Sequence, residues 1–373
     1  MSAIRPTLGI YTPLPGSASG IADYSLTGST LLSGDVRVEF ISLDNYRCPY
    51  DFDLVLYQMG GGRESVAAFR AAAERPGPMI LHEHILSQFF VENHDLLDAN
   101  TNRQVREIFG DALHRTFDSS EELAALMKVD RSLQYLDLGL ERIVVERATF
   151  VFTHSWEALA ELEMRYEGRV RPLDFPVKAL TSEQRMRARG ALGISDGVTV
   201  FGSLGFVGRH KRLPQVLHAW AELDVPSESG RLLVVGRGAA ELRHLANATT
   251  TIVEYVPSGD EFWSLVAAVD IGVQLREPSL GETSGVVAHM LASDVPVITS
   301  RRSVLPIWAN SEMVRIVPPS ADETGQLAGL MQSFLTHRPT GQGRRSDKKI
   351  VPWRESVLAA LEIGEGTGAL EGE

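Results

Sequence analysis

Residues 276–299 of the 373-residue chain read REPSLGETSGVVAHMLASDVPVIT. The run just before them, residues 269–275, is apolar and predicts a buried strand. The run after the central GETSG predicts a helix with its apolar side chains on one face: Val286, Val287, Met290 and Leu291. The stretch therefore predicts a strand, a loop rich in glycine and hydroxyl groups, and a helix.

The start of this helix is the first candidate ligand site. The N–H groups of a first helical turn have no partner inside the helix, and the helix dipole favours an anion there. Glu282 stands where an anion would lie, so contact with hydroxyl groups or a cation suits it better. In the alternative interpretation, Thr283 and Ser284 only cap the helix and Glu282 is solvated.

Strand and helix patterns alternate along both halves of the chain. This alternation predicts α/β folding, with mostly parallel sheets covered by helices on both faces. Helical patterns follow several strands, for example at residues 65–74 and 156–166. The predicted strands are 8–12, 36–42, 54–58, 79–82, 150–154, 198–202, 232–236, 252–256, 269–275, 295–299 and 314–317.

The alternation stops near residues 171–176 and restarts at residue 198, which predicts two doubly wound, Rossmann-like domains facing each other across a cleft. Residues 94–148 are expected to be a helical insertion in the first domain. We place the boundaries as follows: an N-terminal domain 1–176, a linker 177–197, a C-terminal domain 198–340, a closing segment with a helix 341–363, and a disordered tail 364–373.

The composition narrows the functional classes. Lys and Arg number 36 against 48 Asp and Glu, a net charge of −12, which argues against nonspecific binding to nucleic acid. The single cysteine, Cys48, allows no intramolecular disulfide and fits a reducing, cytoplasmic compartment. Neither a signal peptide nor a membrane span is expected. A weak peripheral membrane association and a homodimer stay open.

Ligands of doubly wound sheets bind outside the carboxyl ends of the strands, so residues that follow strands are the candidates. The segment 13–25, PLPGSASGIADYS, follows the first strand, and its glycines could let the backbone meet a ligand. His82 and His84 follow the fourth strand, and His154 follows a later one. A hydrogen-bonding histidine is favoured over a metal pair. Asp51-Phe52-Asp53 precedes a strand and is interpreted as a polar strand entry, not a metal motif.

Residues 202–212, GSLGFVGRHKR, open the first helix of the second half. Its buried face is expected to comprise Leu213, Val216, Leu217 and Trp220. Cations are disfavoured at a helix N-terminus, so the excess of Arg209, Lys211 and Arg212 there favours an anionic ligand over the alternative of a solvated basic turn.

Together, these segments resemble the retaining GT-B glycosyltransferases of family 4, in their GETSG subgroup. The resemblance rests on PLPGSASGIADYS and MILH in the first half. In the second half it rests on FGSLGFVGRHKR, VVGRG, and GETSG followed by PVIT. It covers nearly the whole chain, and the helix from Trp353 resembles the one that crosses back to the first domain in this fold.

The resemblance implies hexosyl or deoxyhexosyl transfer from a nucleotide sugar, with a UDP- or GDP-sugar favoured, to an acceptor hydroxyl, with retention and without a metal or other cofactor. The second domain would bind the donor, and the first would bind a glycan, lipid-linked or small-molecule acceptor. The implied catalytic residues are Lys211 on the diphosphate, Glu282 on the sugar hydroxyls and His82 near the reaction centre. The implied donor-binding residues are Gly20, Arg209, Arg212, Tyr255, Val256, Thr283, Ser284 and Gly285. The acceptor-side candidates are Asp23, Tyr24, His84 and His154.

Two positions depart from the family pattern. Met290 stands where the second glutamate of the E-x7-E motif is expected, and Phe206 stands where an arginine usually precedes the lysine. These departures keep open a non-catalytic protein that binds a sugar nucleotide or scaffolds another transferase. A sugar-nucleotide epimerase of the same fold is a lesser alternative. An NAD-dependent enzyme is disfavoured because Gly236-Arg237-Gly238 lacks a third glycine and a clear acidic partner.

Overall fold

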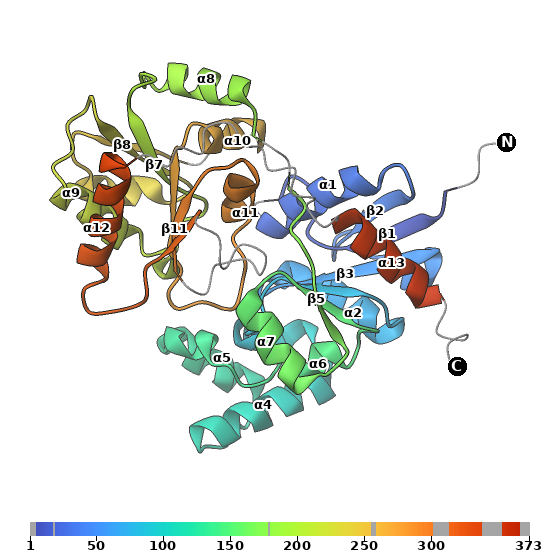
Figure 1. Cartoon of the computed structure of the whole chain (residues 1–373). Helices are drawn as coiled ribbons and strands as arrows, with labels where there is room; N and C mark the ends of the chain where they lie inside the picture. Colours follow the sequence, from blue (N-terminus) through green and yellow to red (C-terminus); the bar gives the residue numbers. More distant parts are fainter. Residues whose placement is uncertain are drawn as a thin grey trace. The chain divides into compact units, whose positions relative to one another are not determined.

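The computed structural model describes residues 5–17, 19–177, 180–254, 259–300, 313–337 and 353–365. These residues form two compact units (Figure 1). The first unit comprises the described residues up to Pro176 together with Leu280–Glu282 and the helix α13 (Trp353–Glu365). The second comprises the other described residues. Each unit is a parallel sheet flanked by helices, which confirms the predicted α/β class.

The first sheet has the strand order β2-β1-β3-β4-β5-β6, and all its pairs are parallel. The predicted strands of the first half correspond to β1 to β5. The short edge strand β6 was not predicted. It ends in a proline, which has no N–H to donate and is typical of sheet edges. The strands are β1 (Thr7–Tyr11), β2 (Arg37–Ile41), β3 (Leu54–Met59), β4 (Met79–Leu81), β5 (Val151–Thr153) and β6 (Val170–Pro172).

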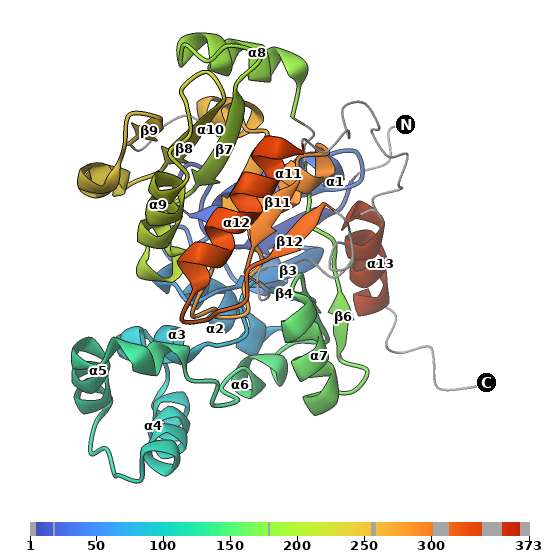
Figure 2. The ribbon, with the colours of Figure 1, turned by 60° about the vertical axis from the view of Figure 1, so that its left-hand side comes forward.

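Alternating side chains of this sheet enter two hydrophobic clusters, as expected for a sheet covered on both faces. Tyr57 contributes to one cluster, which also contains helix α2 and the insertion, while its neighbour Leu56 contributes to the other, which contains Trp353 of α13. The predicted insertion, residues 94–148, contains α4 to α6, and α3 precedes it (Figure 2). The helices of this unit are α1 (Gly20–Leu32), α2 (Val66–Glu74), α3 (Ser87–Glu92), α4 (Ala99–Leu113), α5 (Ser120–Val129), α6 (Arg142–Val145), α7 (Trp156–Arg165) and α13.

The second sheet has the order β12-β11-β10-β7-β8-β9, again with all pairs parallel. Each of its strands was predicted, although several begin or end a few residues away from the prediction. The strands are β7 (Thr199–Leu204), β8 (Gly230–Val235), β9 (Thr250–Val253), β10 (Ile271–Gln274), β11 (Val297–Thr299) and β12 (Val314–Ile316).

Helices cover both faces of the second sheet as well. Leu232 and Val234 of β8 enter one cluster with α9 and α12, and Leu233 and Val235 enter the other with α10 and α11. The predicted apolar face of α9 is confirmed, since all four of its predicted side chains are buried. The helices are α8 (Ser182–Ala191), α9 (Leu213–Glu222), α10 (Gly259–Ala267), α11 (Gly285–Ala292) and α12 (Glu323–Thr336).

In both sheets, the order in which successive strands are added reverses at one central strand. In the first unit, β1 lies between β2 and β3; in the second, β7 lies between β8 and β10. Successive connections therefore leave these central strands on opposite sides. Ligands of doubly wound sheets bind at such points, outside the carboxyl ends of the strands.

Candidate functional site

Lys211 lies at the switch point of the second sheet. It ends a single 3-10 turn, η5 (Arg209–Lys211), that joins β7 to α9. Its ammonium nitrogen reaches back over the β7 turn, because a Cβ built on Gly205 would lie only 2.9 Å from Nζ. Gly205 has φ +117°, a conformation that L side chains rarely adopt. The turn thus places a cation beside partly exposed backbone at the carboxyl end of β7.

The neighbouring loops at this edge are tied together. The N–H of Glu277, in the loop after β10, donates to the carbonyl of His210 at 2.7 Å. The N–H of Arg276 donates to Oγ of Ser300 at 2.7 Å, which links the loops after β10 and β11. These bonds hold the loops after β7, β10 and β11 together around Lys211.

The start of α11 supports both interpretations offered by the sequence. Ser284 is its N-cap and accepts the N–H of Val287 at 3.4 Å, so the capping role is real for this residue. In contrast, Oγ1 of Thr283 is buried and has no hydrogen-bond partner among the described residues. Buried polar atoms normally find a partner, so a ligand oxygen is a natural one here. The carboxylate of Glu282 accepts the N–H of Leu280 at 2.7 Å.

The two arginines of the β7–α9 loop differ in their engagement. Arg212 donates Nε to the buried carboxylate of Glu323 at 2.9 Å, and its Nη2 contacts the same oxygen. Arg209 is exposed on η5. Of these two arginines, Arg209 is therefore the better placed to offer its charge to an anionic ligand.

Met290 faces the interior of the second unit. Its side chain is fully buried, and a Cβ built on Gly272 of β10 would lie 2.5 Å from its sulfur. The strand glycine thus makes room for the methionine. A side chain in this position fills the core, so Met290 packs α11 on the sheet.

The glycine loop after β8 is already occupied by a carboxylate. Glu254 follows β9 and accepts the N–H groups of Gly238 at 2.7 Å and Ala240 at 2.6 Å. These are the amides that would hold a pyrophosphate in a dinucleotide-binding enzyme. Their occupation agrees with the weak sequence case for NAD. The predicted base contacts Tyr255 and Val256 lie outside the described residues.

In the first unit, three predicted residues come together at the carboxyl ends of β4 and β5. The ring of Tyr24 lies edge-on to His82, with 4.6 Å between the centroids, and 5.1 Å from His154. Nε2 of His82 lies 2.9 Å from Oε1 of Gln58, and Nδ1 of His154 lies 2.7 Å from the carbonyl of Leu173. These residues are far apart in the sequence, and the parallel sheet brings them together.

Burial divides the cluster into a ligand candidate and its supports. Tyr24 is 2% exposed and His154 is 1% exposed, whereas His82 is partly exposed. The hydroxyl of Tyr24 also accepts the Trp353 indole N–H at 2.6 Å. Their burial suits Tyr24 and His154 to positioning His82, and their contact with an acceptor stays a prediction.

The imidazoles of this cluster are neutral at pH 7. Burial lowers the pKa of His154 to about 4, against a smaller opposing effect of its bond to the Leu173 carbonyl. Burial, together with the nearby His154, holds the pKa of His82 well below its usual value. A neutral His82 can donate a hydrogen bond to a hydroxyl group or accept one from it, whereas a charged imidazolium can only donate.

These shifts predict acid sensitivity. Because the unfolded chain binds a proton to His154 below its usual pKa of 6.5 and the folded protein does not, stability falls as the pH drops. From this residue we expect a loss of about 1.4 kcal/mol per pH unit below 6.5, or about 2 kcal/mol by pH 5. Urea unfolding of the wild type and of His154→Phe at pH 7.5 and 5 measures the difference. The exposed His218→Gln variant is the control, and an equal acid loss in all three proteins would contradict the assignment.

His84 has a different side-chain partner from His82, which contacts Gln58. It is 4% exposed, and its Nε2 lies 2.8 Å from the carboxylate of Glu161. Asp137 lies close enough to complete a three-residue cluster. However, Arg165 binds both oxygens of Asp137, and the shorter bond measures 2.8 Å. An ion-pair network accounts for this cluster, and the role of His84 in acceptor contact stays a prediction.

Exposed groups at the carboxyl edge of the first sheet remain available to a ligand. Gly20 begins α1, and a Cβ on it would meet nothing within 4 Å. Asp23 is exposed on the first turn of the same helix. Trp156, which was not predicted as a site residue, begins α7 two residues after His154 and is 54% exposed. Its position two residues after the predicted strand 150–154 was the sequence signal that could have identified it.

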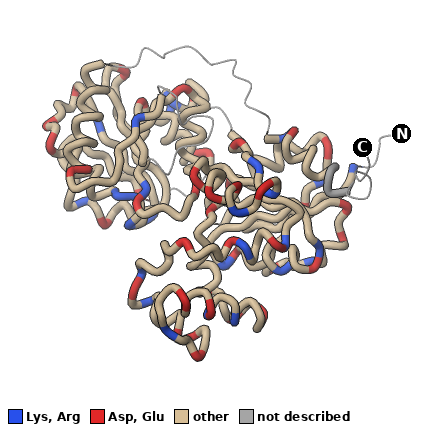
Figure 3. The backbone as a smooth tube through the Cα atoms, turned by 60° about the horizontal axis from the view of Figure 1, so that its bottom comes forward, with Lys and Arg blue, Asp and Glu red and all other residues tan. Residues whose placement is uncertain are grey.

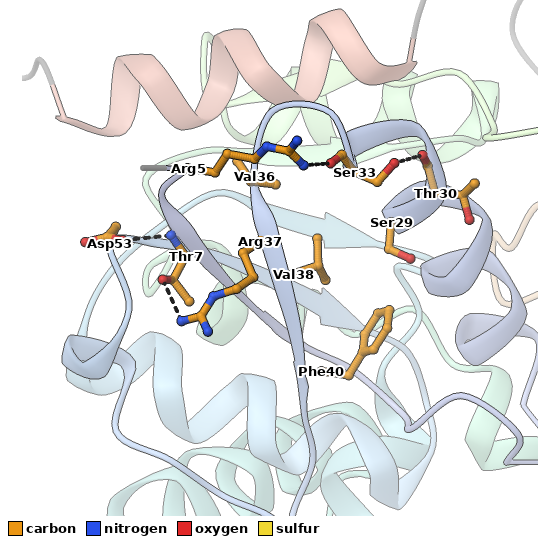
Figure 4. Close-up of a pocket in the computed structure, with 10 residues that line it drawn as sticks. All are labelled: Arg5, Thr7, Ser29, Thr30, Ser33, Val36, Arg37, Val38, Phe40 and Asp53. Carbon is orange, nitrogen blue, oxygen red and sulfur yellow. Dashed lines mark hydrogen bonds between the residues drawn. The ribbon is translucent and has the colours of Figure 1, made fainter. Parts of the chain in front are cut away.

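An open pocket of about 770 Å³ lies elsewhere in the first unit (Figure 4). It adjoins the amino ends of β1 and β2, as its lining residues Thr7 and Arg37 show. The guanidinium of Arg37 donates to Oγ1 of Thr7 at 3.2 Å, and Asp53 accepts the Thr7 N–H at 2.7 Å. The latter bond confirms Asp53 as a strand-entry residue. The pocket lies at the end of the sheet opposite the candidate residues.

Charged residues of both signs are interspersed along the backbone of both units (Figure 3). Among the described residues, no helix combines the length and the apolar character that a membrane span requires.

Neither the model of a known protein family nor the sequence of a curated protein matches the chain. Solved structures do match over nearly its whole length. The Anabaena HepE structure in complex with UDP-glucose has a TM-score of 0.59 and 13% identity, covering 96% of this chain and 100% of that one. Sucrose-phosphate synthase from Thermosynechococcus elongatus has a TM-score of 0.53 and 17% identity, covering 98% of each chain.

A putative UDP-N-acetylglucosamine 2-epimerase from Listeria monocytogenes has a TM-score of 0.55 and 10% identity, covering 96% of each chain. Identities this low establish the fold alone. The parallel six-stranded sheets of the two units, each flanked by helices, match these structures, and the chain has the two-domain α/β fold named GT-B.

Proposed function

We propose that the protein is a retaining, metal-independent glycosyltransferase that moves a hexosyl or deoxyhexosyl group from a UDP- or GDP-sugar to an acceptor hydroxyl. The observation that carries the proposal is the Lys211 ammonium held on the Gly205 turn at the switch point of the second sheet. The similarity to structures of nucleotide-sugar enzymes, one of them holding UDP-glucose, supports it.

The second unit has the chemistry that a departing nucleoside diphosphate requires. As the glycosidic C–O bond breaks, negative charge grows on the leaving phosphate, and fixed donors stabilise it. Lys211 supplies a cation, and the start of α11 supplies backbone N–H groups and the Thr283 hydroxyl. Glu282 remains the proposed partner of the sugar hydroxyls.

The first unit has the groups that suit an acceptor. His82 is neutral, partly exposed and oriented by Gln58, so it can align a hydroxyl group. Trp156 offers an exposed ring on which a sugar could pack. We propose that the acceptor hydroxyl attacks the anomeric carbon on the same face of the sugar from which the diphosphate leaves. The leaving phosphate then takes the proton of the acceptor hydroxyl.

The test is turnover by the pure protein with UDP- and GDP-sugars and a panel of glycan and lipid-linked acceptors, in EDTA. We expect one nucleotide to be released, with retained anomeric configuration in the product by NMR. Nucleotide binding without release of sugar would favour the scaffold alternative. Conversion of the donor to an epimer, without acceptor, would favour the epimerase.

Gly20 gives a prediction for the first unit. Its replacement by alanine meets no protein atom, so stability is expected to change by less than about 1 kcal/mol. If its backbone approaches the donor phosphate, the added methyl group should lower kcat/KM about tenfold, a loss of about 1.4 kcal/mol. Gly34→Ala, which also meets nothing within 4 Å, is the matched control. Equal activity of the two variants would remove Gly20 from the site.

A further inference from the structure

An exposed aromatic ring lies beside the proposed diphosphate site. Phe206 follows Gly205 in the turn after β7 and is 41% exposed. The guanidinium carbon of Arg237, in the turn after β8, lies 5.7 Å from the centroid of its ring.

Backbone contacts fix the two turns against each other. The N–H of Gly205 donates to the carbonyl of Val235 at 2.9 Å, and the N–H of Val207 donates to that of Arg237 at 3.1 Å. A Cβ on Gly236 would lie 1.9 Å from the carbonyl oxygen of Gly205, so no larger residue fits. The ring and the guanidinium are therefore carried by a single, preformed piece of backbone.

Glu254 strengthens this arrangement and limits what can bind. By accepting the N–H groups of Gly238 and Ala240, its carboxylate closes the turn that carries Arg237. A phosphate would be repelled there, because the amides are already satisfied by a negative charge. Phosphate binding is thus directed to Lys211, whose Nζ lies beside Gly205, the residue that precedes Phe206.

We propose that Phe206 and Arg237 form the stacking platform for the nucleobase of the donor. A nucleotide carries an aromatic base and a diphosphate joined by ribose, and this loop presents an aromatic face and a guanidinium next to an ammonium. The inference rests on the proposed function, and it gives Phe206 a role of its own where the family pattern has an arginine. The stacking of one base on an aromatic side chain is worth about 5- to 100-fold in affinity.

The experiment measures binding of UDP, GDP and inorganic pyrophosphate by calorimetry, without metal, to the full chain and its variants. We expect Phe206→Ala to weaken binding of the preferred nucleotide at least fivefold and to leave pyrophosphate unchanged. Phe206→Tyr should retain nucleotide affinity, and Lys211→Ala should weaken both ligands. The control is Ile316→Ala on the edge strand β12, since Ile316 is exposed to a similar extent, 40%.

Unchanged nucleotide affinity in Phe206→Ala would overturn the platform while leaving the proposed function intact. Equal weakening of nucleotide and pyrophosphate would also overturn it, since the substitution would then act on the phosphate loop. If the wild-type protein binds neither UDP nor GDP, the proposed function fails and the platform fails with it.

Discussion

Replacing Lys211 by alanine is expected to lower kcat about 100- to 1,000-fold while the protein stays folded. Removing one preorganised donor from developing negative charge typically costs this much, about 3–4 kcal/mol. Lys211 ends a 3-10 turn and is only partly buried, so we expect the variant to fold. The measurement is donor turnover at saturating substrate, with circular dichroism and melting temperature as checks on folding.

The controls for this prediction separate charge from position. Lys211→Arg keeps the charge but not the compact ammonium beside Gly205, so we expect partial activity. Arg243→Ala removes an exposed cation from η6 (Ala239–Leu245) of the same unit and should retain wild-type turnover. If Lys211→Ala had full activity, the phosphate site would have to be sought elsewhere.

Replacing Trp353 by alanine is expected to destabilise the first unit by about 3–5 kcal/mol, the usual cost of truncating a buried aromatic side chain. The indole is 2% exposed and donates a hydrogen bond to the Tyr24 hydroxyl. It also fills the space over Gly28, where a Cβ would lie 2.5 Å from the ring. Loss of the indole would leave a cavity and an unpaired buried hydroxyl.

Urea unfolding of the full chain measures this effect, and the exposed Trp156→Ala is the matched control, with an expected change below about 0.5 kcal/mol. Gly28→Ala should also destabilise the protein, because the added methyl group would displace the indole. A small effect of Trp353→Ala, similar to that of Trp156→Ala, would show that α13 does not complete the core.

The parts of the fold that follow local patterns could be predicted. Alternating apolar strands and helices gave the two parallel sheets, and apolar spacing gave the buried face of α9. The edge strand β6 was missed because three residues ending in proline carry no alternation. Patterns of this kind report burial and period, and they do not report which distant residues meet.

The candidate site residues also meet in ways that local sequence patterns do not predict. The clustering of Tyr24, His82 and His154 required the sheet order, and the engagement of Arg212 by Glu323 joins residues far apart in sequence. The burial of Met290 against Gly272 depends on how a helix packs on a strand, which spacing within one motif does not specify. The VVGRG motif likewise contains no sign that the carboxylate of Glu254, from a later strand end, accepts the N–H of its Gly238.

The position of Trp353 in the first unit has a consequence for biosynthesis. A ribosome releases the strands of this unit early, but the indole that covers Gly28 is made only after the whole second unit has been translated. At typical elongation rates this delay is roughly 10–30 s. During it, the apolar surface beside Tyr24 lacks the indole that covers it in the folded protein.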